Sequence, residues 1–137
     1  MADLRSATAE DLPTVVDFWD REGGPTHSPG GLAEATRLLE RDPEALVVAV
    51  EEGRIVGTLI VGWDGWRCHM YRLAVEPAYR RRGIARALID EAQRRAIDHG
   101  ARRIDATVHL ENGGAIAAWE SAGFAVEPES GRFLLFL

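Results

Sequence analysis

The sequence predicts a mixed α/β sandwich, with a central sheet of about six to seven strands flanked by about four helices. Three observations support this fold class. Strand-length apolar runs alternate with stretches whose apolar residues recur at helical spacing. Two turns that contain glycine, Glu52-Gly53 and Asp64-Gly65, join successive runs into antiparallel hairpins. A chain of 137 residues also fits one domain, residues 1–137, built around one core.

The first third of the chain predicts one strand and two helices. Residues 4–7 form a short strand, and Thr8 with Asp11 three residues later resembles a capping box that starts a helix. The segment 23–31 is rich in Gly and Pro and is expected to be a loop. A second helix spans residues 32–41 and stops at Asp42-Pro43. The apolar stripes of the two helices are Leu12, Val15, Val16 and Trp19, and Leu32, Ala35, Leu38 and Leu39.

The remainder predicts strands interrupted by two helices. Residues 46–50 and 55–61 form a hairpin, and residues 67–75 continue the sheet. A helix then begins at Gly83 and ends at Gly100. The later elements are expected over 103–110 (strand), 112–122 (short helix), and 124–126 with 133–136 (terminal hairpin). The buried face of the longer helix is Ile84, Leu88, Ile89, Ala92 and Ala96.

Composition narrows the class of protein. No stretch approaches the roughly twenty apolar residues of a membrane span, and the start Met-Ala-Asp-Leu-Arg lacks a secretory signal pattern. A cytoplasmic protein without a membrane partner is therefore expected. The single Cys68 excludes an intrachain disulfide and a cysteine zinc cluster, and no metal site is expected. All sixteen basic residues are Arg, which excludes Schiff-base chemistry on a lysine.

Charge is distributed unevenly along the chain. Residues 1–70 carry 13 acidic and 6 Arg residues, whereas residues 71–137 carry 9 acidic and 10 Arg residues. An acidic half beside a basic turn favours a cationic acceptor at one end of a cleft and a polyanionic cofactor at the other. A solvated surface without a ligand is the alternative. The net charge of −6 argues against nucleic acid as a main partner.

A strand, a tight basic turn and a helix follow one another between residues 71 and 91. Pro77 lacks the N–H that would continue the strand, and Gly83 opens a run of helix formers. The first N–H groups of a helix have no intrahelical partner, and the macrodipole places roughly half a positive charge there. The junction therefore predicts an anion-binding site. Its residues are Arg80, Arg81, Arg82, Gly83, Ile84, Ala85 and Arg86.

The run Arg80-Arg81-Arg82-Gly83-Ile84-Ala85 resembles the Arg/Gln-x-x-Gly-x-Gly/Ala signature of the GNAT superfamily of acyl-CoA-dependent N-acyltransferases. The preceding Leu73-Ala74-Val75-Glu76-Pro77 and the later segment from Asn112 to Phe124 also match. The resemblance covers about residues 45–127. It implies the GNAT fold, whose sheet splays open between the strand ending at Val75 and the strand near Thr107.

The resemblance also implies acetyl-CoA (coenzyme A) as the cofactor. Its pyrophosphate is expected on the basic turn, and its pantetheine arm is expected to pair with the backbone of Leu73, Ala74 and Val75. Asn112, at the start of the later helix, is a further expected coenzyme contact. The same residue fits a helix N-cap, and both roles are compatible.

Direct attack of an amine on a thioester needs a base, donors for the oxyanion and an acid for the departing thiolate. The resemblance assigns the oxyanion donors to backbone N–H groups near Val75. Where the family usually carries a Tyr acid, this sequence has Trp119, whose indole N–H can position or shield the thiol but cannot release a proton. Water can then protonate the thiolate, and Trp119 also fits an apolar contact between helix and sheet. Tyr71 is a second candidate, as an acid or as a wall of the acceptor cleft.

His69 is the candidate base. It lies four residues before Leu73, where the histone-acetylating branch of the family carries a catalytic Glu. Strand alternation predicts that residues 69, 71, 73 and 75 share one face. A free imidazole titrates near ~6.5, which suits proton removal at neutral pH, although a structural or exposed histidine also fits. His109 and Glu111 are reserve bases that act through water.

We therefore expect an N-acetyltransferase that transfers acetyl from acetyl-CoA to a primary amine of a small molecule in a sequential reaction. In this family the first two helices and their loop build the acceptor site, which here includes His27. Relatives that dimerise through terminal strands make residues 133–136 a candidate homodimer contact.

The sequence suggests three alternative functions. A non-catalytic acyl-CoA sensor on the same fold is suggested by Trp119 and Thr107. A protein or peptide N-acetyltransferase is the second, but the branch that acetylates protein N-termini carries Glu where this chain has Thr107. A dinucleotide-binding unit is disfavoured because Ala85 and Leu88 occupy two of its three glycine positions.

Overall fold

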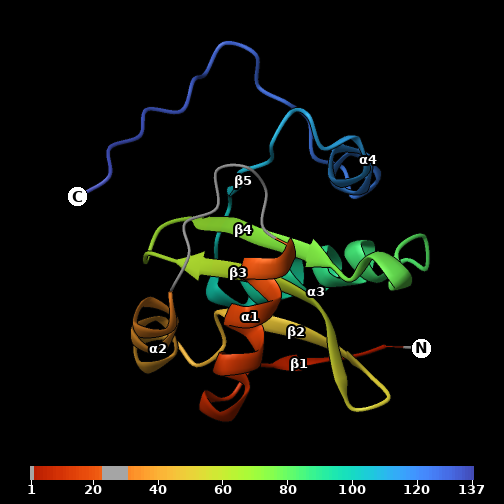
Figure 1. Cartoon of the computed structure of the whole chain (residues 1–137). Coiled ribbons are helices and arrows are strands. Elements are labelled where there is room, and N and C mark those ends of the chain that lie inside the picture. The colour runs from red at the N-terminus through yellow and green to blue at the C-terminus, as the bar shows by residue number, and fades with distance from the viewer. Residues whose placement is uncertain (1, 23–30) are drawn as a thin grey trace.

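The computed structural model of the chain describes residues 2–22 and 31–137. Within them lies a five-stranded mixed sheet in the order β1-β2-β3-β4-β5 (Figure 1). Strands β1 to β4 pair antiparallel with one another, and β5 runs parallel to β4. The strands are β1 Asp3–Ser6, β2 Leu46–Glu51, β3 Arg54–Trp63, β4 Cys68–Val75 and β5 Ile104–Ala106.

The described residues also form four α-helices, which cover both faces of the sheet. They are α1 Leu12–Glu22, α2 Leu32–Arg41, α3 Ile84–His99 and α4 Gly113–Ser121, with short 3₁₀ helices at η1 Ala9–Asp11 and η2 Pro77–Tyr79. In Figure 1, α1 crosses in front of the sheet and α3 lies behind it. None of these helices combines the length and the apolar character that crossing a membrane requires.

Two clusters of buried apolar side chains hold the helices on the sheet. On the α3 face, the sheet residues Val47, Val56 and Leu59 pack with Leu88 and Ile89. The opposite cluster joins α1 to the sheet through Leu12, Val15, Phe18, Trp19, Leu46, Val48 and Ile60. The predicted stripes of α1 and α3 are therefore buried, and each fully buried Val, Leu, Ile or Phe side chain contributes roughly 1.5–3 kcal/mol. In α2, Ala35 is buried while Leu38 and Leu39 are half-buried. Leu32 is an exception, because at the first position of α2 it stays 47 % exposed.

The N-terminal elements form as expected. Asp11 Oδ2 accepts a hydrogen bond from the backbone N–H of Thr8 over 2.8 Å, which completes the predicted capping box. The predicted loop over 23–31, including His27, lies outside the described residues except for Gly31.

The predicted mixed α/β fold with four helices is confirmed, but the described chain has five strands where six to seven were expected. The expected terminal hairpin does not form in residues 124–137. The backbone N–H of Phe124 donates to the Trp119 carbonyl over 3.1 Å, so Phe124 closes α4 instead of starting a strand. Pro128 has no N–H to offer a ladder. The tail extends away from the sheet, and Phe133 is fully exposed (Figure 1).

The strand predicted over 103–110 is also shorter than expected. β5 pairs only with Cys68, His69 and Met70 of β4. The last contact of this ladder is the Thr107 N–H, which donates to the Met70 carbonyl over 3.1 Å. The ladder between β4 and β5 ends at this point, so in the described structure no strand lies beside the second half of β4. The predicted splay of the sheet near Thr107 is observed.

Candidate active site

A β-bulge divides β4 at its centre. Thr58 of β3 faces Ala74, and Ile60 faces Tyr71, so Leu59 lies opposite two residues, Arg72 and Leu73. Arg72 takes up the extra length with a φ of 60°, in the left-handed region. The bulge therefore interrupts the alternation of side chains along the strand.

This interruption corrects the prediction that residues 69, 71, 73 and 75 share one face. Before the bulge, Cys68 and Met70 pack towards α3, which leaves His69 and Tyr71 on the α1 side. After the bulge, Leu73 and Val75 pack towards α3 instead, while Ala74 packs towards α1. The candidate base thus lies on the opposite face from the side chains of Leu73 and Val75.

A buried hydroxyl fixes the bulge. Thr58 is fully buried, and its Oγ1 accepts a hydrogen bond from Trp19 Nε1 and donates one to the Arg72 carbonyl, both over 2.9 Å. The guanidinium of Arg72 also lies over the Trp19 ring, 5.0 Å from its centroid. A carbonyl that the bulge removes from the ladder thereby keeps a partner.

The open edge of β4 is where a pantetheine arm is expected. Leu73, Ala74 and Val75 lie beyond the last ladder contact with β5, so no described strand covers their outer edge. The Val75 carbonyl accepts a hydrogen bond from Arg80 Nε over 3.1 Å. The strand end and the basic turn are therefore tied together.

The basic turn has the backbone of an anion site. The first hydrogen bond of α3 runs from the Ala87 N–H to the Gly83 carbonyl over 3.0 Å, so the N–H groups of residues 84–86 have no partner inside the helix. Gly83 adopts a φ of 81°, and a Cβ placed there would meet nothing within 4 Å. A phosphate can therefore approach these N–H groups closely, at the positive end of the helix dipole.

The four arginines of the turn have different roles. Arg80 lies 3.6 Å from Glu22, Arg82 stacks over the Tyr79 ring at 4.9 Å, and Arg86 donates to the Ser121 carbonyl over 2.7 Å. Arg81 has neither an ion pair nor a side-chain hydrogen bond with any described residue, and its φ is 63°. Three arginines thus have partners within the protein, whereas the side chain of Arg81 has none among the described residues.

The two α4 candidates are placed differently from each other. Asn112 Oδ1 accepts a hydrogen bond from the Ala115 N–H over 3.0 Å, so it is an N-cap. Trp119 is 4 % exposed and meets the Phe124 ring edge-on at 4.9 Å, within the cluster on the α3 face. Since His69 lies on the other face, the structure does not bring Trp119 and His69 together.

His69 stands between two carboxylates. Its Nδ1 lies 3.4 Å from Asp105 Oδ2 on β5, and its Nε2 lies 3.6 Å from Asp64 Oδ2 on the β3–β4 turn. Backbone hydrogen bonds from Arg67 and Trp66 hold the pKa of Asp64 below its usual value, so that carboxylate stays ionised. The imidazole side chain is 49 % exposed to solvent. His109 and Glu111 are exposed in the turn after β5.

A pocket of about 240 Å³ opens beside the bulge on the α1 face. Tyr71 and Arg72 form one wall, and burial raises the pKa of the Tyr71 phenol, so Tyr71 stays protonated at neutral pH. Glu34 of α2 supplies a carboxylate. The described lining residues are Trp19, Gly31, Glu34, Ala35, Leu38, Ile60, Tyr71 and Arg72.

Sequence reasoning missed the residues that shape this site. Thr58 and Trp19 fix the bulge, and Asp64 and Asp105 flank the histidine. One signal was available, because Thr58 is the polar member of the otherwise apolar run from Ile55 to Val61. Asp105 carried no such signal, since its approach to His69 depends on the pairing of β4 with β5.

Comparisons with known proteins agree on one family. The family described as "Acetyltransferase (GNAT) family" matches residues 10–124. An acetyltransferase of Sodalis glossinidius is 32 % identical over 127 residues, which cover 91 % of this chain and 88 % of that relative.

Solved structures match in fold. Ard1 from Thermoplasma volcanium has a TM-score of 0.79 at 20 % identity, covering 92 % of this chain and 84 % of that protein. An aminoglycoside N-acetyltransferase in complex with CoA has a TM-score of 0.76 at 21 % identity, covering 100 % of this chain and 94 % of that protein.

Proposed function

Because the chain belongs to the GNAT family of acetyltransferases, we propose that it transfers the acetyl group of acetyl-CoA to a primary amine of a small molecule. The activity of an N-acetyltransferase and the use of acetyl-CoA follow from membership of the family. The nature of the acceptor and the roles of individual residues are the proposal.

The pocket beside the bulge carries this proposal. Its volume of about 240 Å³ lies just below the ~300–1,000 Å³ usual for small-molecule sites, so it suits a compact acceptor. Ala35, Leu38 and Ile60 supply an apolar floor, and the carboxylate of Glu34 attracts a cationic amine. Tyr71 links the pocket to the strand whose open edge is expected to hold the donor.

The donor side is assigned to the turn and the strand edge. The N–H groups of residues 84–86 and the side chain of Arg81 bind the pyrophosphate, and the backbone of Leu73, Ala74 and Val75 pairs with the pantetheine arm. Acetyl-CoA supplies an activated thioester carbonyl. Backbone N–H groups near Val75 polarise that carbonyl as charge develops on its oxygen.

Proton transfer is assigned to the α1 face. His69 removes the proton of the acceptor ammonium, and Asp105 orients its ring and stabilises the imidazolium that forms. His69 precedes Leu73 by four positions, at most about 13 Å of extended chain, so the proton travels through water. Tyr71, which is protonated at neutral pH, donates a proton or hydrogen bond to the departing thiolate. Trp119 supports α4 from within the core.

The test combines calorimetric titration with acetyl-CoA and a thiol-release assay across a panel of amines. We expect binding, with turnover on small primary amines, and a lower KM for acceptors without a negative charge. Binding together with turnover on peptides alone would contradict the small-molecule acceptor. Binding without turnover on a broad panel supports an acyl-CoA sensor instead, and an absence of binding contradicts the donor site.

A further inference from the structure

A second pocket lies at the opposite end of α3 from the basic turn. It has a volume of about 350 Å³, larger than the pocket beside the bulge. The 16 residues of α3 separate it from Gly83 by about 24 Å, so it is distinct from the expected pyrophosphate site. Its lining comes from the β3–β4 turn, the end of α3 and the segment before β5, namely Trp63, Gly65, Trp66, Arg67, His99, Gly100, Arg102 and Arg103.

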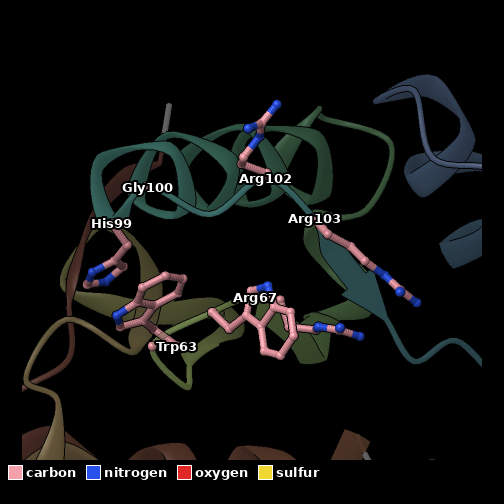
Figure 2. A pocket seen from close by; sticks show the side chains of 8 residues that line it. Trp63, Arg67, His99, Gly100, Arg102 and Arg103 are labelled. Atoms are coloured by element: carbon pink, nitrogen blue, oxygen red, sulfur yellow. The ribbon is translucent and has the colours of Figure 1, made fainter.

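The lining of this pocket is basic although the chain is acidic. It contains three arginines and no carboxylate, on a chain with a net charge of −6. Neither Arg67 nor Arg102 has an ion pair with a described residue, and Arg103 lies 3.2 Å from Asp105. Figure 2 shows Arg67 and Arg103 extending towards the same side from two different segments, while Arg102 points away from Trp63. Arg67 and Arg103 are therefore both available at this pocket to contact an anion, which Arg103 would share with Asp105.

Two carbonyls at the C-terminal end of α3, next to this pocket, are capped by backbone N–H groups. The Gly100 N–H donates to the Ile97 carbonyl over 2.9 Å, and the Ala101 N–H donates to the Ala96 carbonyl over 3.0 Å. Gly100 allows this closure because its φ of 91° lies in the left-handed region.

Aromatic side chains line the pocket together with the arginines. Trp63 and His99 stack with centroids 5.1 Å apart and planes 7° from parallel, which forms a rigid wall (Figure 2). Trp66 is 77 % exposed, and the guanidinium of Arg67 lies 5.3 Å from its ring centroid. An indole kept open to solvent beside a guanidinium is a platform on which a planar ring can stack.

We propose that this pocket binds a small anion that carries a planar aromatic ring, of the size and chemistry of a nucleoside monophosphate. The anionic group lies between Arg67 and Arg103, and the ring stacks on Trp66. The site is distinct from the expected pyrophosphate site, which lies at the other end of α3.

The probe is AMP, titrated calorimetrically into the full chain in the presence of saturating CoA, which blocks adenine nucleotides from the donor site. We expect AMP to bind more tightly than adenosine or inorganic phosphate alone, because each of these has only half of the required chemistry. Arg103→Gln, Arg67→Gln and Trp66→Ala should each weaken AMP binding about tenfold or more. Arg54→Gln, an exposed arginine at the far end of β3, is the matched control and should leave AMP affinity unchanged.

Each variant is also titrated with acetyl-CoA, whose unchanged affinity shows that the fold and the donor site are intact. A second readout uses the indole N–H signals of the four tryptophans in a two-dimensional NMR spectrum. AMP should move the signals of Trp63 and Trp66 and leave those of Trp19 and Trp119 in place. An absence of AMP binding, equal affinity for phosphate alone, or binding that the three variants leave intact overturns the proposal.

Discussion

The indole N–H of Trp19 on α1 donates a hydrogen bond to the hydroxyl of Thr58 on β3 over 2.9 Å. The same hydroxyl donates to the carbonyl of Arg72 in the bulge of β4, also over 2.9 Å. One buried side chain therefore ties a helix on one face of the sheet to the bulge between the proposed donor edge and the proposed acceptor pocket. The Thr58 hydroxyl thus accepts a hydrogen bond from a side-chain N–H and donates one to a backbone carbonyl.

Thr58→Val should destabilise the protein by about 1–3 kcal/mol, because it removes the acceptor of the buried Trp19 N–H and a donor to the Arg72 carbonyl. The bulge should also loosen, so kcat should fall more than the affinity for acetyl-CoA. Urea denaturation and steady-state kinetics measure the two effects. Thr58→Ser keeps the hydroxyl and is the matched control, which should retain most of the activity. Equal stability of the Val and Ser variants would show that the hydroxyl has no such role.

Gly57→Ala should shift the N-terminal end of α3. A Cβ at this position would lie 3.0 Å from Leu88 Cδ1, 3.2 Å from Ile84 Cγ2 and 3.3 Å from the Ala74 carbonyl. We expect a loss of roughly 1–3 kcal/mol from overpacking and a higher KM for acetyl-CoA, since Ile84 opens the helix of the donor site. Adding Leu88→Val should relieve part of the loss in stability. If the double variant loses as much as the two single variants together, the contact with Leu88 is not the cause.

Most of the fold could be predicted because local patterns coincide with the tertiary structure. The stripe of Leu12, Val15, Val16 and Trp19 has no alternative to facing a sheet, and Gly53 and Gly100 are needed where the backbone enters the left-handed region. The terminal hairpin could not be predicted in the same way. An apolar run such as residues 133–136 specifies a strand only where a partner edge exists, and Phe124 already donates its N–H to α4.

The basic turn of the candidate site could be predicted from the residues that form it. The parts of the site that depend on how β4 pairs with its neighbouring strands could not. Pro77 and Gly83 predict the turn because their backbone properties do not depend on the surrounding structure. The bulge, in contrast, interrupts the alternation of side chains along β4. The prediction of which face each side chain occupies depends on that alternation. Nothing in Arg72-Leu73 distinguishes a bulge from a regular strand, so Leu73 and Val75 were placed on the face of His69.

Gly83→Glu should weaken acetyl-CoA binding by about tenfold or more relative to Gly83→Ala. Both variants force a side chain to a φ of 81° and share that cost of roughly 1–2 kcal/mol, while neither added Cβ meets a neighbour within 4 Å. The difference between them therefore reports the negative charge beside the expected pyrophosphate. Calorimetric titration measures it, and equal dissociation constants for the two variants would contradict the assignment of the turn.

His69→Ala should lower kcat by about 10²-fold and leave the KM for acetyl-CoA nearly unchanged, with the largest loss near neutral pH. Asp105→Asn should reduce kcat less, because it removes only the carboxylate that lies 3.4 Å from Nδ1. Its effect should disappear in the His69→Ala background, since a positioning residue acts only through the ring. The pH profile of kcat measures both. His109→Ala is the comparison variant, and a larger loss there than at position 69 would move the base to His109.

Stability at low pH should depend on Asp11. Its hydrogen bond from Arg5, at 2.6 Å, lowers its pKa from 3.8 to about 2, with a smaller effect from the Thr8 N–H. Because the folded state holds the proton less tightly than the unfolded state, the stabilisation is complete above about pH 4 and is lost as the pH falls towards 2. Urea midpoints measured from pH 6 to pH 2.5 should therefore fall more steeply for the wild type than for Asp11→Asn. Arg5→Gln keeps the cap and removes the main cause of the shift, so its curve should also be shallower. Parallel curves for all three proteins would show that Asp11 contributes nothing to the acid response.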